Sequence, residues 1–112
     1  NTEYNGTFTV DVFEAATATK PNDDLSNVYV YPNPVRPEFN GTVKISGLTD
    51  KANIKITDIE GNLVYETTAS GGTIEWDTSA FGKYKVASGV YMIFVAAQDG
   101  IDTKVKKVMI IR

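Results

Sequence analysis

A chain of 112 residues with a formal net charge of -3 is long enough for one compact core and too short for two. It contains no cysteine and no histidine, which excludes disulfides, thiolate chemistry, serine–histidine triads and most zinc sites. The 42% hydrophobic content is typical of a globular domain. The acidic excess argues against a nucleic-acid surface, and no apolar run reaches the roughly 20 residues of a membrane span.

The N-terminal part of the chain is predicted to lie outside the main domain. The stretch TFTVDVF (7–13) alternates apolar and polar residues and predicts a strand, either left over from an upstream domain or added to the edge of this one. Helical signals in 13–20 end at Pro21. We therefore assign 1–26 to an upstream strand remnant and linker. Because the chain begins with Asn instead of Met, we expect it to be part of a longer protein.

The remainder of the chain, 27–112, shows the two-residue alternation of β-strands, separated by turn residues at hairpin spacing. The predicted strands are 28–31, 42–46, 53–59, 62–68, 73–76, 90–97 and 103–112. This pattern predicts an all-β fold, an immunoglobulin-like antiparallel β-sandwich of about seven strands.

One face of each strand is expected to form the core. The predicted core residues are Val28, Val30, Val43, Ile45, Ile54, Ile56, Leu63, Tyr65, Ile74, Trp76, Tyr91, Ile93, Val95, Val108 and Ile110. The strand at 90–97 is apolar on both faces, so we expect a central strand that is either covered twice or open to a partner. The last strand breaks its alternation at Lys106-Lys107, where we predict a bulge that lets Val105 and Val108 share a face.

The segment VYVYPNPV (28–35) sets an alternating run against two prolines. Pro32 and Pro34 remove amide donors and favour extended backbone at the residues before them, so the strand should end there at a sheet edge. The local chemistry leaves two interpretations open, a strand terminator with an Asn turn or a recognition motif. Either way, the segment forms a stiff entry into the domain.

Several stretches together resemble, in order, the C-terminal sorting domain of the type IX (Por) secretion system of Bacteroidetes. They are VYVYPNPV (28–35), GLTDKANIKITDIEGNLVYE (47–66), GGTIEWD (71–77), VASGVY (86–91) and TKVKKVMIIR (103–112). The chain also resembles the related immunoglobulin-like domain of flagellar hook-capping proteins. Within the sorting family it looks most similar to the PorZ-like subgroup, in which a β-propeller precedes this domain.

The resemblance implies delivery or attachment of an exported protein, from the periplasm to the outer-membrane surface, and no enzymatic activity or cofactor. It implies as partners the proteins of the outer-membrane secretion or attachment machinery, an upstream domain such as a β-propeller, and lipopolysaccharide. The loop at 36–41 is longer than in compact sorting domains. This departure favours a domain that is retained, as in PorZ-like proteins, over one that is cleaved.

The resemblance also carries recognition positions onto this chain. They are Tyr31, Pro32, Asn33, Pro34, Asp58, Gly61, Asn62, Gly89, Val90, Tyr91, Lys104, Lys107, Val108 and Ile110. Each also has a simpler structural interpretation: the glycines as turn residues, the lysines as a solvated edge strand. An edge strand with open backbone groups could also bind by strand addition.

Other function classes remain open from the sequence. The first is a structural spacer or dimerising module. The second is a carbohydrate-binding module, which would need an exposed row among Tyr29, Tyr65, Phe81, Tyr84 and Phe94. Calcium binding at the acidic pairs Asp23-Asp24 and Asp99/Asp102 is a weak third possibility, because the residues lack the ligand pattern of an EF-hand loop.

Overall fold

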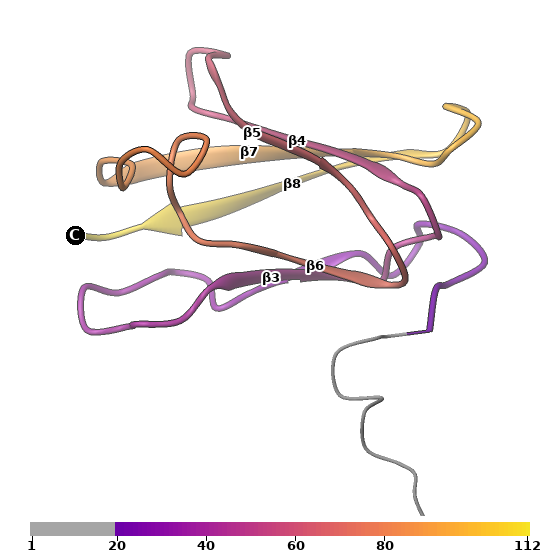
Figure 1. Ribbon diagram of the computed structural model, residues 1–112, viewed down its shortest axis with the longest axis horizontal. Coiled ribbons are helices and arrows are strands. Elements are labelled where there is room, and N and C mark those ends of the chain that lie inside the picture. Colours follow the sequence, from indigo (N-terminus) through magenta and orange to yellow (C-terminus); the bar gives the residue numbers. More distant parts are fainter. Residues whose placement is uncertain (1–19) are drawn as a thin grey trace, which may run out of the picture.

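The computed structural model describes residues 20–112 and shows two antiparallel sheets packed face to face (Figure 1). The first sheet has the order β2-β3-β6, and the second has the order β5-β4-β7-β8. The strand bounds are β2 Tyr29–Tyr31, β3 Val43–Ser46, β4 Asn53–Thr57, β5 Leu63–Thr68, β6 Thr73–Trp76, β7 Gly89–Ala96 and β8 Thr103–Ile110. The predicted all-β sandwich of seven strands is confirmed. The predicted strand at 7–13 lies outside the described residues.

The core lies between the sheets and follows the predicted alternation closely. Trp76 is fully buried, donates its indole N–H to the Ser79 carbonyl at 3.0 Å, and meets the Tyr91 ring edge-on at 5.9 Å. Asp77 then accepts a hydrogen bond from the Ser79 backbone N–H at 3.0 Å, so its carboxylate caps the loop after β6. A buried indole whose polar atom is satisfied stabilises the centre of the sandwich.

Some core predictions need correction. Leu63 is 40% exposed, because a bulge between Ile56 and Thr57 shifts the β4–β5 register and turns Leu63 to the other face. Val30, Tyr65 and Ile74 are partly buried against the core. The core also contains residues from loops and short turns that alternation does not identify, namely Leu25, Val35, Leu48, Ala52, Ala69, Ala80 and Val86. The division of the chain at residue 26 stays a prediction, although Leu25 packs fully inside the domain.

The predicted bulge at Lys106-Lys107 is wrong. The register between β7 and β8 runs unbroken from Gly89 opposite Ile110 to Ala96 opposite Thr103. Val105 is therefore on the outer face and 52% exposed, while Val108 is fully buried. The lysines at 104 and 106 share the inward side of β8 with Val108 but are only partly buried. Their long apolar stems can lie along the sheet while the ammonium groups stay in water, so the strand needs no bulge.

The outer face of β7 is open, which resolves the choice left by its apolar composition. Tyr91, Ile93 and Val95 are buried, whereas Phe94 is 41% exposed. The strand is thus central in its sheet and covered on one side only within the described part of the chain. No helix of residues 20–112 is long and apolar enough to cross a membrane.

Candidate recognition surface

The segment after β2, residues 31–35, runs along the edge of β8 and is called the entry segment below. Strand β2 ends at Tyr31, and the peptide bonds before Pro32 and Pro34 are both cis. The Asn33 side-chain N–H donates to the Lys107 carbonyl at 3.0 Å, and the Asn33 side-chain oxygen accepts the Met109 N–H at 3.1 Å. A carboxamide has the same donor and acceptor as a peptide group. Asn33 therefore takes the place of a strand residue beside β8.

Val35 continues this pairing by one further step. Its N–H donates to the Met109 carbonyl at 2.8 Å, and its carbonyl accepts the Ile111 N–H at 2.7 Å, which makes a parallel bridge to Ile110. The Val35 side chain is buried in the core. Together, Asn33 and Val35 seal the C-terminal half of the β8 edge. They also fix the entry segment to the last strand of the fold.

The start of β7 lies on the other side of β8 at the same end of the sandwich. Gly89, Val90 and Tyr91 pair with Ile110, Met109 and Val108. The Tyr91 hydroxyl donates to the Ala87 carbonyl at 2.7 Å. Burial raises the pKa of Tyr91, and the negative charge of Asp58 adds to the rise. Backbone and side-chain hydrogen bonds thus join the entry segment to β8, and β8 to the start of β7.

The hairpin between β4 and β5 holds its own turn together. The Asp58 carboxylate accepts the backbone N–H groups of Glu60 and Asn62, both at 2.9 Å, and the Asn62 side-chain N–H at 2.9 Å. The Asn62 contacts, followed by the Glu60 and Gly61 amides, hold the pKa of Asp58 below its ordinary value. Gly61 has φ of 93°, a left-handed conformation that favours glycine, and no atom lies near where its Cβ would be. These three residues therefore build a turn, and their role in recognition stays a prediction.

The lysines of the last strand occupy different places. Lys107 is exposed on the outer face, whereas Lys104 lies opposite Val95 toward the other end of β8. Lys104 is close enough to Asp24 to help lower the pKa of that carboxyl, which the Ser26 hydroxyl and amide lower more strongly. The structure thus separates Lys104 from the residues around Asn33.

The predicted positions fall into two groups by exposure. Val108 and Ile110 are fully buried or nearly so, and Tyr91 is 6% exposed, so these residues support the surface from below. Tyr31, Asn33 and Lys107 are exposed and Val90 is partly so. These four residues, which we call the entry surface, lie around the junction between residues 31–35 and β8. Tyr31 is on the outer side of the first sheet, whereas Lys107 and Val90 are on the outer side of the second.

Sequence reasoning missed Arg112. Its guanidinium donates to the Val86 carbonyl at 2.8 Å and to the Thr78 carbonyl and hydroxyl at 3.3 and 3.2 Å, while its backbone N–H donates to the Ser88 hydroxyl at 2.8 Å. Arg112 thereby fastens the end of β8 to the loop between β6 and β7. A single arginine after an apolar strand has no local pattern that would indicate these contacts.

The alternative sites do not assemble in the described residues. No group of three or more acidic side chains within 20–112 could hold a metal ion. Asp24 and Asp99 instead accept backbone N–H groups two residues further on. The aromatic residues are dispersed: Tyr29 stacks on Tyr31 at the edge of one sheet, and Phe94 lies on the outer face of the other. They do not form a single row.

Comparison with known proteins gives one family. The profile of the secretion system C-terminal sorting domain, Por_Secre_tail, matches residues 29–111. Among solved structures, the chain is similar to PorZ of Porphyromonas gingivalis, described as an essential bacterial surface component of the type IX secretion system, with a TM-score of 0.74 and 38% identity. The match covers 80% of this chain and 12% of that one. Comparison with curated sequences finds no match.

Proposed function

Because the chain belongs to the family of secretion-system C-terminal sorting domains, we propose that it directs or anchors an exported protein at the outer membrane through type IX secretion. The observation that carries this proposal is the attachment of the entry segment to the last strand. Asn33 bonds to the backbone of Lys107 and Met109, so the motif segments from the start and from the end of the domain are joined at the edge of β8. Machinery that must recognise many cargoes needs such a feature on a shared fold.

The finer parts of the proposal follow from the similarity to PorZ. The chain corresponds to 12% of the matched protein, which supports an upstream domain, such as a β-propeller, as its neighbour in the same chain. The retained form of the domain, the contact with outer-membrane machinery proteins and an association with lipopolysaccharide are parts of the same proposal. We assign it no enzymatic role.

The test is surface delivery of a fusion. A signal peptide and a fluorescent protein are placed before all 112 residues, in a bacterium with a working type IX pathway. The test variant changes two exposed residues of the entry surface, Tyr31→Ser and Lys107→Glu. The matched control changes the same residue types in an exposed loop, Tyr84→Ser and Lys83→Glu. We expect surface fluorescence to fall strongly for the test variant and to stay at the unmodified level for the control.

Folding must be measured beside delivery. Both variants alter exposed side chains, so both should keep the thermal unfolding midpoint of the parent within a few degrees. Equal delivery of all three fusions would refute recognition at the entry surface. Periplasmic retention of the unmodified fusion would refute the sorting function itself and would leave a structural spacer as the remaining interpretation.

A further inference from the structure

The N-terminal half of the β8 edge is open. Odd-numbered residues of β8 direct their backbone groups away from β7, as the bonds of Lys107 and Met109 to Asn33 demonstrate. By the same alternation, the N–H and C=O groups of Thr103 and Val105 point away from β7, in the plane of the sheet. No described residue pairs with them, because the Asn33–Val35 segment reaches only the other half. An exposed row of backbone donors and acceptors is a template for another strand.

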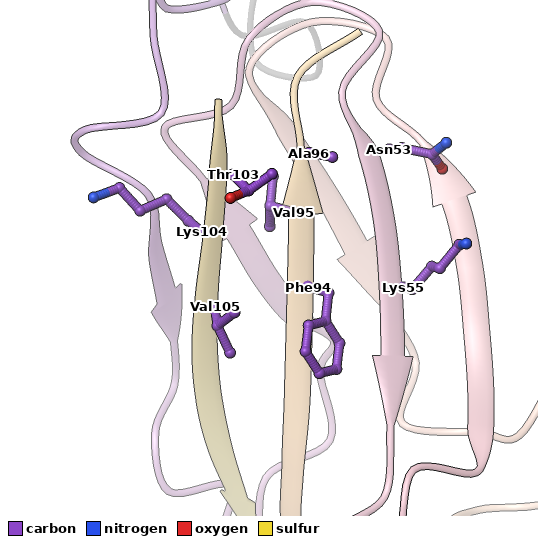
Figure 2. Close-up of a pocket in the computed structure, with 8 residues that line it drawn as sticks. All are labelled: Asn53, Lys55, Phe94, Val95, Ala96, Thr103, Lys104 and Val105. Atoms are coloured by element: carbon purple, nitrogen blue, oxygen red, sulfur yellow. The ribbon is translucent and has the colours of Figure 1, made fainter. Parts of the chain in front are cut away.

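The outer side of this open half is apolar. Val105 and Phe94 lie directly opposite each other in the β7–β8 register and are 52% and 41% exposed. Figure 2 shows the two side chains next to each other on the face of the sheet. A shallow hollow of about 280 Å³ extends from them past Ala96 and Asn53 to Lys55. A strand added beside β8 would place alternate side chains against Val105 and extend this apolar strip.

The other side of the open half is basic. Lys104 and Lys106 share the inward side of β8, and both are only partly buried. Lys106 forms no ion pair with any residue of 20–112, and Lys104 has only the longer-range influence of Asp24. In Figure 2 the Lys104 side chain extends past β8, away from Phe94. An added strand would meet these two ammonium groups with every second side chain.

We propose that the edge of β8 from Thr103 to Lys106 binds an extended segment of a partner protein by strand addition, and that this segment alternates apolar and acidic residues. The apolar residues would pack beside Val105, and the acidic residues would face Lys104 and Lys106. This inference rests on the proposed function, since it gives the chemistry by which the machinery would hold the domain.

A second copy of the chain fits this edge poorly. Antiparallel pairing of two copies centred on Val105 sets Lys104 of one copy opposite Lys106 of the other, twice. Like charges directly opposite each other on one sheet face are destabilising. The lysines thus select against self-pairing and in favour of an acidic partner, which is how natural edge strands avoid aggregation.

The experiment measures backbone hydrogen exchange and peptide binding on the full chain. The probe is a short synthetic peptide of alternating valine and glutamate, and the control peptide has lysine in place of glutamate. We expect the Val105 amide to exchange rapidly in the free protein and to become protected when the valine–glutamate peptide is added. The charge-reversed variant Lys104→Glu/Lys106→Glu should bind that peptide at least about tenfold more weakly and gain affinity for the lysine peptide.

A second pair of variants tests the backbone contact. Val105→Pro removes the backbone N–H that points away from β7 and leaves the hydrogen bonds between β8 and β7 in place. It should weaken binding about threefold to tenfold. Val105→Ala, which keeps the N–H, should weaken it less. If Val105→Pro fails to fold, the charge-reversed pair still decides the question, because those side chains are partly exposed.

Several outcomes would overturn the inference. Rapid exchange at Val105 with and without peptide would mean that no strand is added there. Protection in the free protein would assign the edge to residues 1–19 of the same chain, or to a second copy if protection rises with protein concentration. Peptide binding that ignores the lysine reversal would contradict the acidic partner. The delivery assay is independent, so the sorting function can stand where strand addition fails.

Discussion

The two halves of the β8 edge solve the same physical problem in different ways. At the C-terminal half, Asn33 and Val35 supply the missing hydrogen-bond partners of Lys107, Met109 and Ile111. At the N-terminal half, the backbone of Thr103 and Val105 faces outward without a partner from the described residues. One strand thus belongs to the closed sandwich at one end and, at the other end, has backbone groups that no described residue pairs with.

The difference follows from what each half contributes to the core. The sealed half carries Val108 and Ile110, which are each 1% exposed or less. The open half carries lysines at the same inward positions, 104 and 106. Apolar burial therefore holds the sealed half in place, while solvation and charge keep the open half soluble without covering it.

Truncating one residue in each half should give the largest contrast in stability. Ile110→Ala removes buried methyl groups and leaves a cavity, so we expect a loss of about 2–5 kcal/mol in the free energy of unfolding. Val105→Ala removes an exposed side chain and should change it by about 0.5 kcal/mol or less. Urea denaturation of both variants measures the contrast. Similar losses would show that the open half is covered in solution.

Removing the Asn33 carboxamide should convert part of the sealed half into open edge. Asn33→Ala deletes two hydrogen bonds to β8, each with a net value of about 0.5–1.5 kcal/mol. We therefore expect a modest loss of global stability and much faster hydrogen exchange at the Met109 amide. The matched control is Asn40→Ala in the exposed loop before β3, which should change neither quantity. Unchanged protection of Met109 would mean that Val35 alone holds the edge.

The strands could be predicted from the sequence because their signals are local. Alternation and turn residues locate each end of the seven described strands to within two residues, and a fully buried Trp76 follows from its place at the end of such a run. The exposure of Leu63 could not be predicted in the same way. It depends on a bulge in the pairing of β4 with β5, and pairing is set by contacts between strands.

The candidate site was harder to predict for the same reason. The YPNP segment is recognisable, but the bonds of Asn33 span 74 and 76 residues along the chain. They join a side chain to a backbone, which leaves no periodicity in either sequence segment. The missing bulge at Lys106-Lys107 has a related cause. Lysine can occupy an inward position where the sandwich opens to water, so a broken apolar pattern need not mean a broken register.

The turn at Asp58 offers the smallest expected effect and a check that the β8 comparison is local. Hydrogen bonds, chiefly from Asn62, hold the pKa of Asp58 below the aspartate value of about 3.9 that the unfolded chain would show. A group with a lowered folded-state pKa stabilises the fold above its unfolded pKa, and this contribution is lost as the pH falls through the folded-state value. The free energy of unfolding of Asp58→Asn should therefore fall less steeply than that of the parent as the pH drops below about 4.

The measurement is urea denaturation of Asp58→Asn and the parent at a series of pH values from neutral to acidic. The two stability curves should converge at low pH, because the parent then loses what the variant never had. Exchange at the Met109 and Val105 amides should be the same in both proteins at neutral pH, since the bonds of Asp58 stay within its own turn. A change at Met109 would couple the turn to the sealed edge through Tyr91, whose pKa is raised by burial and further by the charge of Asp58. The entry surface would then have to include the β4–β5 hairpin.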